Sequence, residues 1–297
     1  MEWKIPLRFR KILDGKVKLK QIIIAFIHII VSYHIVMKAD DIGYLGYEIC
    51  HQEPFDTILA YIIYMITSVP SILLFTKIVT RRPLSEFGLK RPFLKKHWCA
   101  TAFILPLSVF AYYLLFTDGT LIQTETQTSQ ILLLITSSLF LGLSSGMVEE
   151  ILFRGIIMKN TEWLLSKKAA ILLPSLAFAF VHISQVDRSD RLSVGLLMLG
   201  GTLVGIMFSA IVYESGSIWP SAFVHGVWNM FVNLLTVTPV TNPPPSSLYY
   251  YLLNDKNVLI TGGAFGLETS ATAIAGYLVV TLLAFYLNRR NTFIRHV

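Results

Sequence analysis

Charge is what this sequence lacks most. Only 14% of its 297 residues are charged, whereas 54% are hydrophobic and the mean hydropathy is +0.61. Soluble domains usually carry about 25% charged residues. One soluble core cannot hide so large an excess of apolar side chains, so the composition predicts a protein that uses the lipid bilayer as its solvent.

Cysteines are scarce, and the sequence has neither a signal-peptide cleavage site nor an internal repeat. The two cysteines, Cys50 and Cys99, fall on opposite sides of the predicted membrane, so we expect no disulfide and no cysteine-based metal site. An apolar run over 21–37 follows the basic N-terminus, but no small-x-small cleavage site follows Met37. We interpret this run as a first membrane anchor. The absence of an internal repeat argues against a transporter built from two similar halves.

Long apolar runs, by contrast, fill most of the chain. A helix that spans a bilayer needs about 20 mostly apolar residues. Eight segments reach or approach this length: 21–37, 56–79, 98–116, 130–158, 169–185, 192–213, 217–237 and 269–288. The sequence therefore predicts an all-α, polytopic membrane protein with about eight transmembrane helices in a single domain, 1–297.

Basic residues are distributed unevenly between the two sides of this layout. Nineteen Lys and Arg residues fall on the side of both termini, and four fall on the other side, namely Lys38, Arg188, Arg191 and Lys256. Because short cytoplasmic loops are enriched in Lys and Arg, we expect both termini in the cytoplasm. The net charge of +7 follows from this pattern and does not imply a nucleic-acid partner.

Two connecting segments have distinctive compositions. The basic segment 80–96 is expected to lie against anionic lipid head groups. The segment 238–267 is expected to be an outer loop, with a proline run at Pro243–Pro245 and three tyrosines at Tyr249–Tyr251. Tyrosine rings favour the membrane interface, so these three are predicted to lie there.

Three polar clusters lie within predicted membrane helices, where one ionisable side chain costs about 2.5–3.5 kcal/mol. The first contains Glu149, Glu150 and Arg154. Glu150 and Arg154 are four residues apart and can pair on one helix face, whereas Glu149 points elsewhere. The alternative is that the helix ends here and leaves these charges in the cytoplasm, but the apolar run continues after Arg154.

The other two clusters contain histidine. His182 lies four residues after Phe178 in the fifth predicted helix, and His225 and Asn229 share one face of the seventh. Taken singly, His182 is typical of a satisfied structural histidine. For His225 and Asn229, hydrogen bonding between membrane helices explains the pattern as well as a functional role does.

Depth in the membrane connects the three clusters. Glu149 and His225 lie roughly 12–13 Å, and His182 roughly 15–20 Å, from the cytoplasmic ends of their helices at 1.5 Å per residue. We therefore expect one buried pocket nearer the cytoplasm. A carboxylate can deprotonate water, and imidazoles can hold a metal or stabilise an oxyanion. The set predicts hydrolysis, with either a bound metal or a glutamate-activated water.

The three motifs together resemble a known family, the CAAX-protease and bacteriocin-processing membrane proteins, called CPBP or Abi. Its pattern is Glu-Glu-x-x-x-Arg, Phe-x-x-x-His and His-x-x-x-Asn/Asp on separate helices. Here the pattern occurs in order within a core of about 131–233, as Glu149-Glu150…Arg154, Phe178…His182 and His225…Asn229. The segment 216–221 and, weakly, 85–89 also resemble the family.

The resemblance implies the eight-helix fold of the prenyl-protein endopeptidases and an intramembrane protease, either glutamate-dependent or metal-dependent. It implies that Glu149 activates water and that His182, His225 and Asn229 complete the site. Glu149, His182 and His225 would be the ligands if Zn²⁺ is bound. Phe178, Glu150 and Arg154 would support the pocket.

The resemblance also limits the partners. The substrate would be a membrane-associated protein or peptide, such as a prenylated protein or a bacteriocin precursor, surrounded by membrane lipid. The compact length and the lack of organelle signals favour a prokaryotic plasma membrane, with the endoplasmic reticulum as the alternative. Some family members are non-catalytic scaffolds or immunity proteins, but this chain retains every motif residue, which favours the enzyme.

Overall fold

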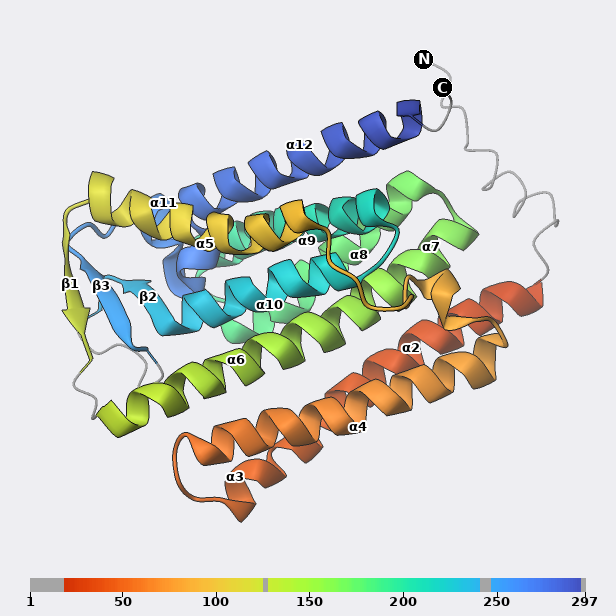
Figure 1. Cartoon of the computed structure of the whole chain (residues 1–297), viewed down its shortest axis with the longest axis horizontal. Helices are drawn as coiled ribbons and strands as arrows, with labels where there is room; N and C mark the ends of the chain where they lie inside the picture. The colour runs from red at the N-terminus through yellow and green to blue at the C-terminus, as the bar shows by residue number, and fades with distance from the viewer. Residues whose placement is uncertain (1–18, 125–127, 241–246, 295–297) are drawn as a thin grey trace.

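Long helices that run back and forth make up most of the chain in the computed structural model, which describes residues 19–124, 128–240 and 247–294 (Figure 1). Within those residues, seven helical segments are long and apolar enough to cross a membrane: Leu19–Ile49, Phe55–Thr80, Lys96–Phe116, Gln130–Leu164, Lys167–Gln185, Arg191–Ser215 and Ala271–Arg290. The helix α10 (Trp219–Leu234) also runs through the bundle but has only 16 residues. The prediction of an all-α, polytopic membrane protein is confirmed.

Individual helices make up these segments and set their boundaries. They are α2 (Leu19–Gly43) with α3 (Leu45–Ile49), α4 (Phe55–Thr80), α5 (Lys96–Phe116), α6 (Thr128–Glu150), η2 (Ile151–Ile157), α7 (Met158–Leu164), α8 (Lys167–Val181), η3 (His182–Gln185), α9 (Arg191–Ser215) and α12 (Ala271–Ile294). A short turn, η1 (Leu84–Phe87), lies between α4 and α5. Local chemistry fixes several ends. The Ser166 side chain caps α8, the Asp190 side chain caps α9, and Gly216, with φ of 71°, ends α9.

The basic residues gather at one end of the bundle. Because successive helices alternate in direction, the 81–95 and 165–166 connections lie at the same end as the start of α2 and the end of α12 (Figure 1). The 186–190 connection lies at the opposite end. The basic residues before Leu19, and Arg295, lie outside the described residues. The predicted asymmetry of basic residues thus corresponds to a higher density of Lys and Arg at one end of the fold than at the other.

A three-stranded sheet closes the opposite end. β1 (Gly119–Gln123) pairs antiparallel with β3 (Tyr249–Leu253), which pairs parallel with β2 (Leu235–Thr238). The segment 238–267 is therefore not the simple loop that the sequence predicted. Tyr251 is buried, and its hydroxyl donates to the carbonyl of Thr117 at 2.9 Å. The Pro243–Pro245 run lies outside the described residues.

After β3, the chain turns back toward the bundle through three short helices. They are α11 (Val258–Thr261), η4 (Gly263–Phe265) and η5 (Leu267–Thr269). The last of them packs on α9, where a Cβ added to Gly200 would lie 3.2 Å from Thr269 Cγ2. This contact holds the segment before α12 against the interior of the fold.

Glycines bring α6 and α10 into backbone contact. A Cβ at Gly146 would lie 2.6 Å from the carbonyl oxygen of Ala222 and 2.8 Å from the backbone nitrogen of Gly226. Such small residues allow membrane helices to pack closely. Because Glu149 lies three residues after Gly146 and His225 directly precedes Gly226, this contact brings the two predicted catalytic side chains together.

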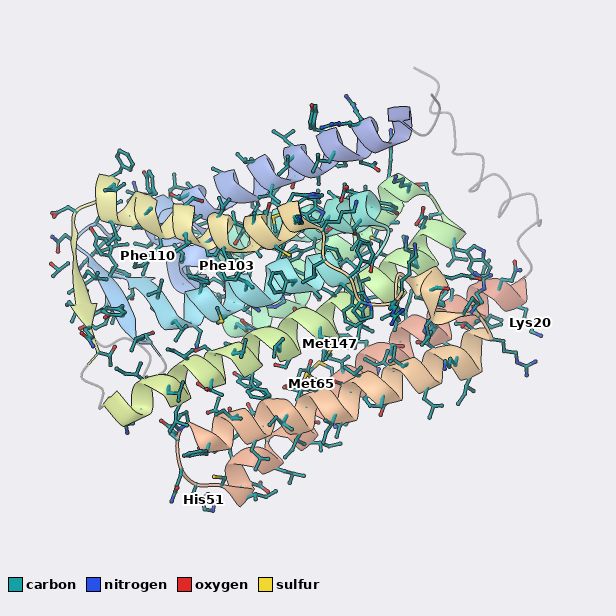
Figure 2. The ribbon with its side chains drawn as sticks, in the orientation of Figure 1. Lys20, His51, Met65, Phe103, Phe110 and Met147 are labelled. Carbon is teal, nitrogen blue, oxygen red and sulfur yellow. The ribbon has the colours of Figure 1, made fainter. Side chains whose placement is uncertain are left out.

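The N-terminal helices form a layer on the outside of α6. Figure 2 shows Met65 of α4 beside Met147 of α6, and both residues line the same apolar groove. The hairpin of α2 and α4 therefore covers one side of α6. The other side of α6 faces the cavity that holds the polar clusters.

Candidate active site

A cavity of about 440 Å³ lies among α6, α8, α9, α10 and the segment before α12. Its lining includes five residues that the sequence singled out: Glu149, Phe178, His182, His225 and Asn229. Glu150 and Arg154 lie behind this wall and are almost completely buried. The structure thus brings together residues from three separate motifs. The cavity extends from them toward Thr236 and Val237 at the sheet end.

His225 lies between two glutamates. Its Nδ1 donates to Oε1 of Glu150 at 3.2 Å, and its Nε2 lies 3.9 Å from Oε2 of Glu149. The second distance is too long for a hydrogen bond. The imidazole also stacks on Phe208, with 4.5 Å between the ring centroids. His225 is therefore fixed in orientation, with Nε2 directed toward Glu149.

Glu150 is the most fully satisfied carboxylate of the site. It accepts hydrogen bonds from Nη1 of Arg154 at 2.7 Å, from Oγ of Ser221 at 2.6 Å and from His225. Arg154 also donates to the carbonyl of Gly205 at 3.2 Å. A buried charge pair is tolerated when its remaining hydrogen-bonding groups are satisfied in this way. The predicted pairing of Glu150 with Arg154 is present in the structure.

A wide π-helical turn, η2, carries Arg154. Residues 151–156 of this turn are all buried, and the helix continues beyond it as α7. The alternative that the membrane helix ends at Glu150 and leaves Arg154 in the cytoplasm is therefore wrong. π-helical turns are rare and occur frequently at functional sites.

Glu149 differs from its neighbour because its Oε2 lacks a hydrogen-bond partner. Its side chain is 23% exposed, and no hydrogen bond from the described residues reaches its Oε2, although this atom is itself buried. Buried polar atoms of native proteins are nearly always paired, so an unpaired one requires an explanation. The Glu149 side chain lines the cavity, and no hydrogen bond to a described protein group occupies its Oε2, so the carboxylate remains free to serve a water or a substrate.

His182 and Asn229 are each held by one hydrogen bond. The Nδ1 of His182 donates to the carbonyl of Phe178 at 2.7 Å, which in the neutral ring leaves the lone pair on Nε2. Asn229 donates from Nδ2 to Oγ of Ser145 at 2.8 Å. Both side chains border the cavity in fixed orientations.

The structure adds residues that the sequence did not reveal. Ser221 binds Glu150, Phe208 stacks on His225, and the indole N–H of Trp228 donates to Oε1 of Glu268 at 2.9 Å. Ser221 and Trp228 lie four residues before and three residues after His225, so helical spacing could have placed both on its face. Glu268 gave no such signal, because it fell beside the predicted boundary of the last membrane helix.

The three predicted metal ligands line one cavity. Among the described residues, no group of three or more His, Cys, Asp or Glu side chains is placed to hold a metal ion. The Nδ1 atoms of His182 and His225 are already engaged, and Oε2 of Glu149 is 3.9 Å from the free nitrogen of His225. The Zn²⁺ site of Glu149, His182 and His225 therefore stays a prediction, in which the Nε2 atoms of the two histidines would be the ligands.

Comparison with known families agrees with the geometry. Residues 128–231 match the family model described as type II CAAX prenyl endopeptidase Rce1-like. The match covers about a third of the chain and agrees with the resemblance of its three motifs to the CAAX-protease family. The matched segment runs from α6 into α10 and contains every motif residue from Glu149 to Asn229. Neither a curated protein nor a solved structure matches the chain.

Proposed function

We propose that this protein is an intramembrane endopeptidase in which Glu149 activates water. The observation that carries the proposal is the unpaired Oε2 of Glu149, which lies on a cavity wall 3.9 Å from His225. A carboxylate with no competing donor is free to bind a water molecule and take its proton. The Rce1-like match favours peptide-bond hydrolysis as the reaction.

Each motif residue has a role in this mechanism. Glu149 accepts a proton from water while the water oxygen attacks the carbonyl carbon of the scissile bond. The negative charge that develops on the carbonyl oxygen is stabilised by donors on the cavity wall. The candidates are Nε2–H of a protonated His182 or His225 and the amide of Asn229. Glu150, supported by Arg154, holds His225 through its Nδ1.

The substrate in this proposal is a membrane-associated protein or peptide. A volume of about 440 Å³ is within the range of ligand pockets and accepts a short peptide segment. Apolar residues such as Leu197, Val204 and Phe208 line much of the cavity. Such walls suit a segment delivered from the bilayer. A prenylated protein is the substrate that the family description favours, and a bacteriocin precursor would offer the same kind of segment.

Replacing Glu149 with glutamine tests the proposed role. Glutamine keeps the shape of the side chain but cannot accept the proton, so we expect turnover of a membrane-embedded substrate by purified protein to fall about 10²–10⁴-fold. The matched control is Glu48→Gln, which changes an exposed glutamate at the sheet end of the bundle. Undiminished turnover by Glu149→Gln would exclude its role. No turnover by the wild type with any candidate substrate would favour a non-catalytic scaffold or immunity protein.

A chelator separates the two mechanisms that the sequence left open. If Glu149 activates water directly, treatment with a chelator leaves turnover unchanged. If Zn²⁺ is required, chelation inactivates the protein and added Zn²⁺ restores it. Among the described residues no group of three or more His, Cys, Asp or Glu side chains is placed to hold a metal ion, and this supports the first result.

We also propose that the basic end of the bundle faces the cytoplasm of a prokaryotic cell. The support is the gathering of Lys and Arg residues at that end. Single cysteines at Ser189 and Arg290, in a chain with Cys50→Ser and Cys99→Ser, report on the two ends. An impermeant thiol reagent added to intact cells should label position 189 and not position 290. The reverse pattern would invert the topology.

A further inference from the structure

Glu268 belongs to the same cavity, although it lies outside the matched family segment. It sits in η5, three residues before α12, and lines the cavity together with Glu149, His182 and His225. The neighbouring Phe265 approaches His182, with 6.2 Å between their ring centroids. A segment after the sheet thus supplies a second carboxyl group to the catalytic cavity.

Several contacts hold Glu268 in place. Its Oε1 accepts the indole N–H of Trp228 at 2.9 Å, and its backbone carbonyl accepts the Tyr277 hydroxyl at 3.0 Å. The Thr269 hydroxyl donates to the carbonyl of Gly262 at 2.6 Å. Gly200 lets this segment approach α9, because a Cβ there would lie 3.5 Å from the Glu268 carbonyl oxygen. The carboxyl group is therefore positioned from α10, α12 and its own turn.

The surroundings of Glu268 favour a neutral carboxyl group. None of the ion pairs between described residues involves Glu268, whereas Glu150 pairs with Arg154. Burial raises the pKa of the Glu268 carboxyl above its ordinary value, and the charge of Glu149 acts in the same direction. The Trp228 hydrogen bond, His182 and His225 oppose this rise. Tyr277 of α12 also faces Glu268.

We propose that Glu268 is the general acid of this cavity and protonates the leaving nitrogen of the cleaved peptide bond. The inference rests on the proposed hydrolysis. With Oε1 accepting from Trp228, the proton resides on Oε2. A base on α6 and an acid on η5 then reach the scissile bond from different elements.

The proton balance closes without a further reactant. Glu149 takes one proton from water as the new C–O bond forms, and the carbonyl becomes a tetrahedral oxyanion. As the carbonyl re-forms, the C–N bond breaks, its electron pair goes to nitrogen, and Glu268 supplies the proton. The products are a carboxylic acid and an amine. Transfer of a proton from Glu149 to Glu268, through water, restores both groups.

Infrared difference spectroscopy tests the resident proton without any turnover. Wild-type protein in detergent at neutral pH should show a carboxyl C=O band that Glu268→Gln removes. Glu48→Gln, as the control, should leave the band unchanged. A wild-type spectrum without a Glu268-dependent band would overturn the inference, even before a substrate is known.

Kinetics test the acid role. Glu268→Gln keeps an oxygen acceptor for Trp228, so the fold should persist while kcat falls by up to about 10²–10⁴-fold with little change in KM. Activity that needs a protonated acid is lost as pH rises through its pKa, so the alkaline limb of the kcat profile should disappear in this variant. Glu268→Asp should restore part of the activity.

Trp228→Phe provides a readout that a purely structural role would not move. The indole hydrogen bond lowers the pKa of Glu268, so removing it should shift the alkaline limb to higher pH. Suppose that Glu149→Gln is inactive, whereas Glu268→Gln keeps the wild-type kcat and an unchanged alkaline limb. This result would refute the acid role of Glu268 and leave the proposed hydrolysis standing. An active Glu149→Gln would refute the hydrolysis mechanism itself.

Discussion

Two buried histidines of this bundle differ in their hydrogen-bond partners and in their surroundings. His28 of α2 donates from Nε2 to Thr76 of α4 at 3.0 Å, and its Nδ1 accepts from Asn160 of α7 at 3.0 Å. Its side chain is 0% exposed. His225, at 4% exposed, is bound on one nitrogen only and directs the other toward Glu149 across 3.9 Å.

The residue type alone does not decide the role of a polar group in a membrane. Both histidines lie on apolar helices, and a carboxamide belongs to each cluster, Asn160 in one and Asn229 in the other. At His28 both ring nitrogens are paired, so the cluster joins three helices. At His225, an unpaired carboxylate oxygen and a cavity remain. A catalytic group must be held in a fixed orientation and still have a hydrogen-bonding atom that no other protein group occupies.

Replacing each histidine with alanine should give the largest difference between the two clusters. His225→Ala should lower turnover about 10²–10⁴-fold, because it removes a group that faces both glutamates and the substrate cavity. His28→Ala should leave turnover per folded molecule unchanged and reduce the amount of folded protein. Turnover of the model substrate and the yield of monodisperse protein in detergent measure the two effects. Equal activity losses in both variants would erase the distinction.

The Glu150–Arg154 pair extends the comparison to charged groups. Arg154→Met should destabilise the fold by about 3–5 kcal/mol, because the carboxylate of Glu150 would remain buried without its cation. Arg82→Met is the matched control, since its partner Glu86 lies 3.5 Å away at an exposed site. That change should cost about 0–1 kcal/mol. Reversible unfolding in mixed micelles measures both variants.

The charge-swapped variant, Glu150→Arg with Arg154→Glu, should recover only part of that loss. The swap restores opposite charges, but it removes the carboxylate that Ser221 and His225 bind and the guanidinium that binds Gly205. Normal stability of both single variants would show that the pair has no structural role. Full recovery by the swap would show that the surrounding hydrogen bonds contribute little.

The sequence predicted the features that depend on local patterns. Apolar length located the membrane helices, and spacing along single helices placed Glu150 beside Arg154 and His225 beside Asn229. The sheet could not be predicted in the same way, because Gly119 pairs with Leu253 across more than a hundred intervening residues. Nothing within either segment identifies its partner.

Glu268 was missed for a related reason. Its place in the cavity depends on β3, on the turn at Gly262 and on the close approach to Gly200, and these contacts join distant parts of the chain. The hydropathy pattern located only the start of the last helix. Motif spacing therefore found the site residues on the long helices and could not find one supplied by a connecting segment.

The smallest expected effect concerns the His28 cluster itself. A double-mutant cycle of His28→Phe and Asn160→Leu isolates the hydrogen bond between these side chains. Such bonds between membrane helices contribute on average about 0.6 kcal/mol and at most about 1.7 kcal/mol, because the unfolded chain in the membrane also finds partners. We expect a coupling energy in this range, measured by unfolding in mixed micelles, with turnover per folded molecule unchanged. A coupling near zero would mean that packing alone holds α2 against α7. A loss of turnover in folded Asn160→Leu would instead give the His28 cluster a part in the chemistry and remove the contrast with His225.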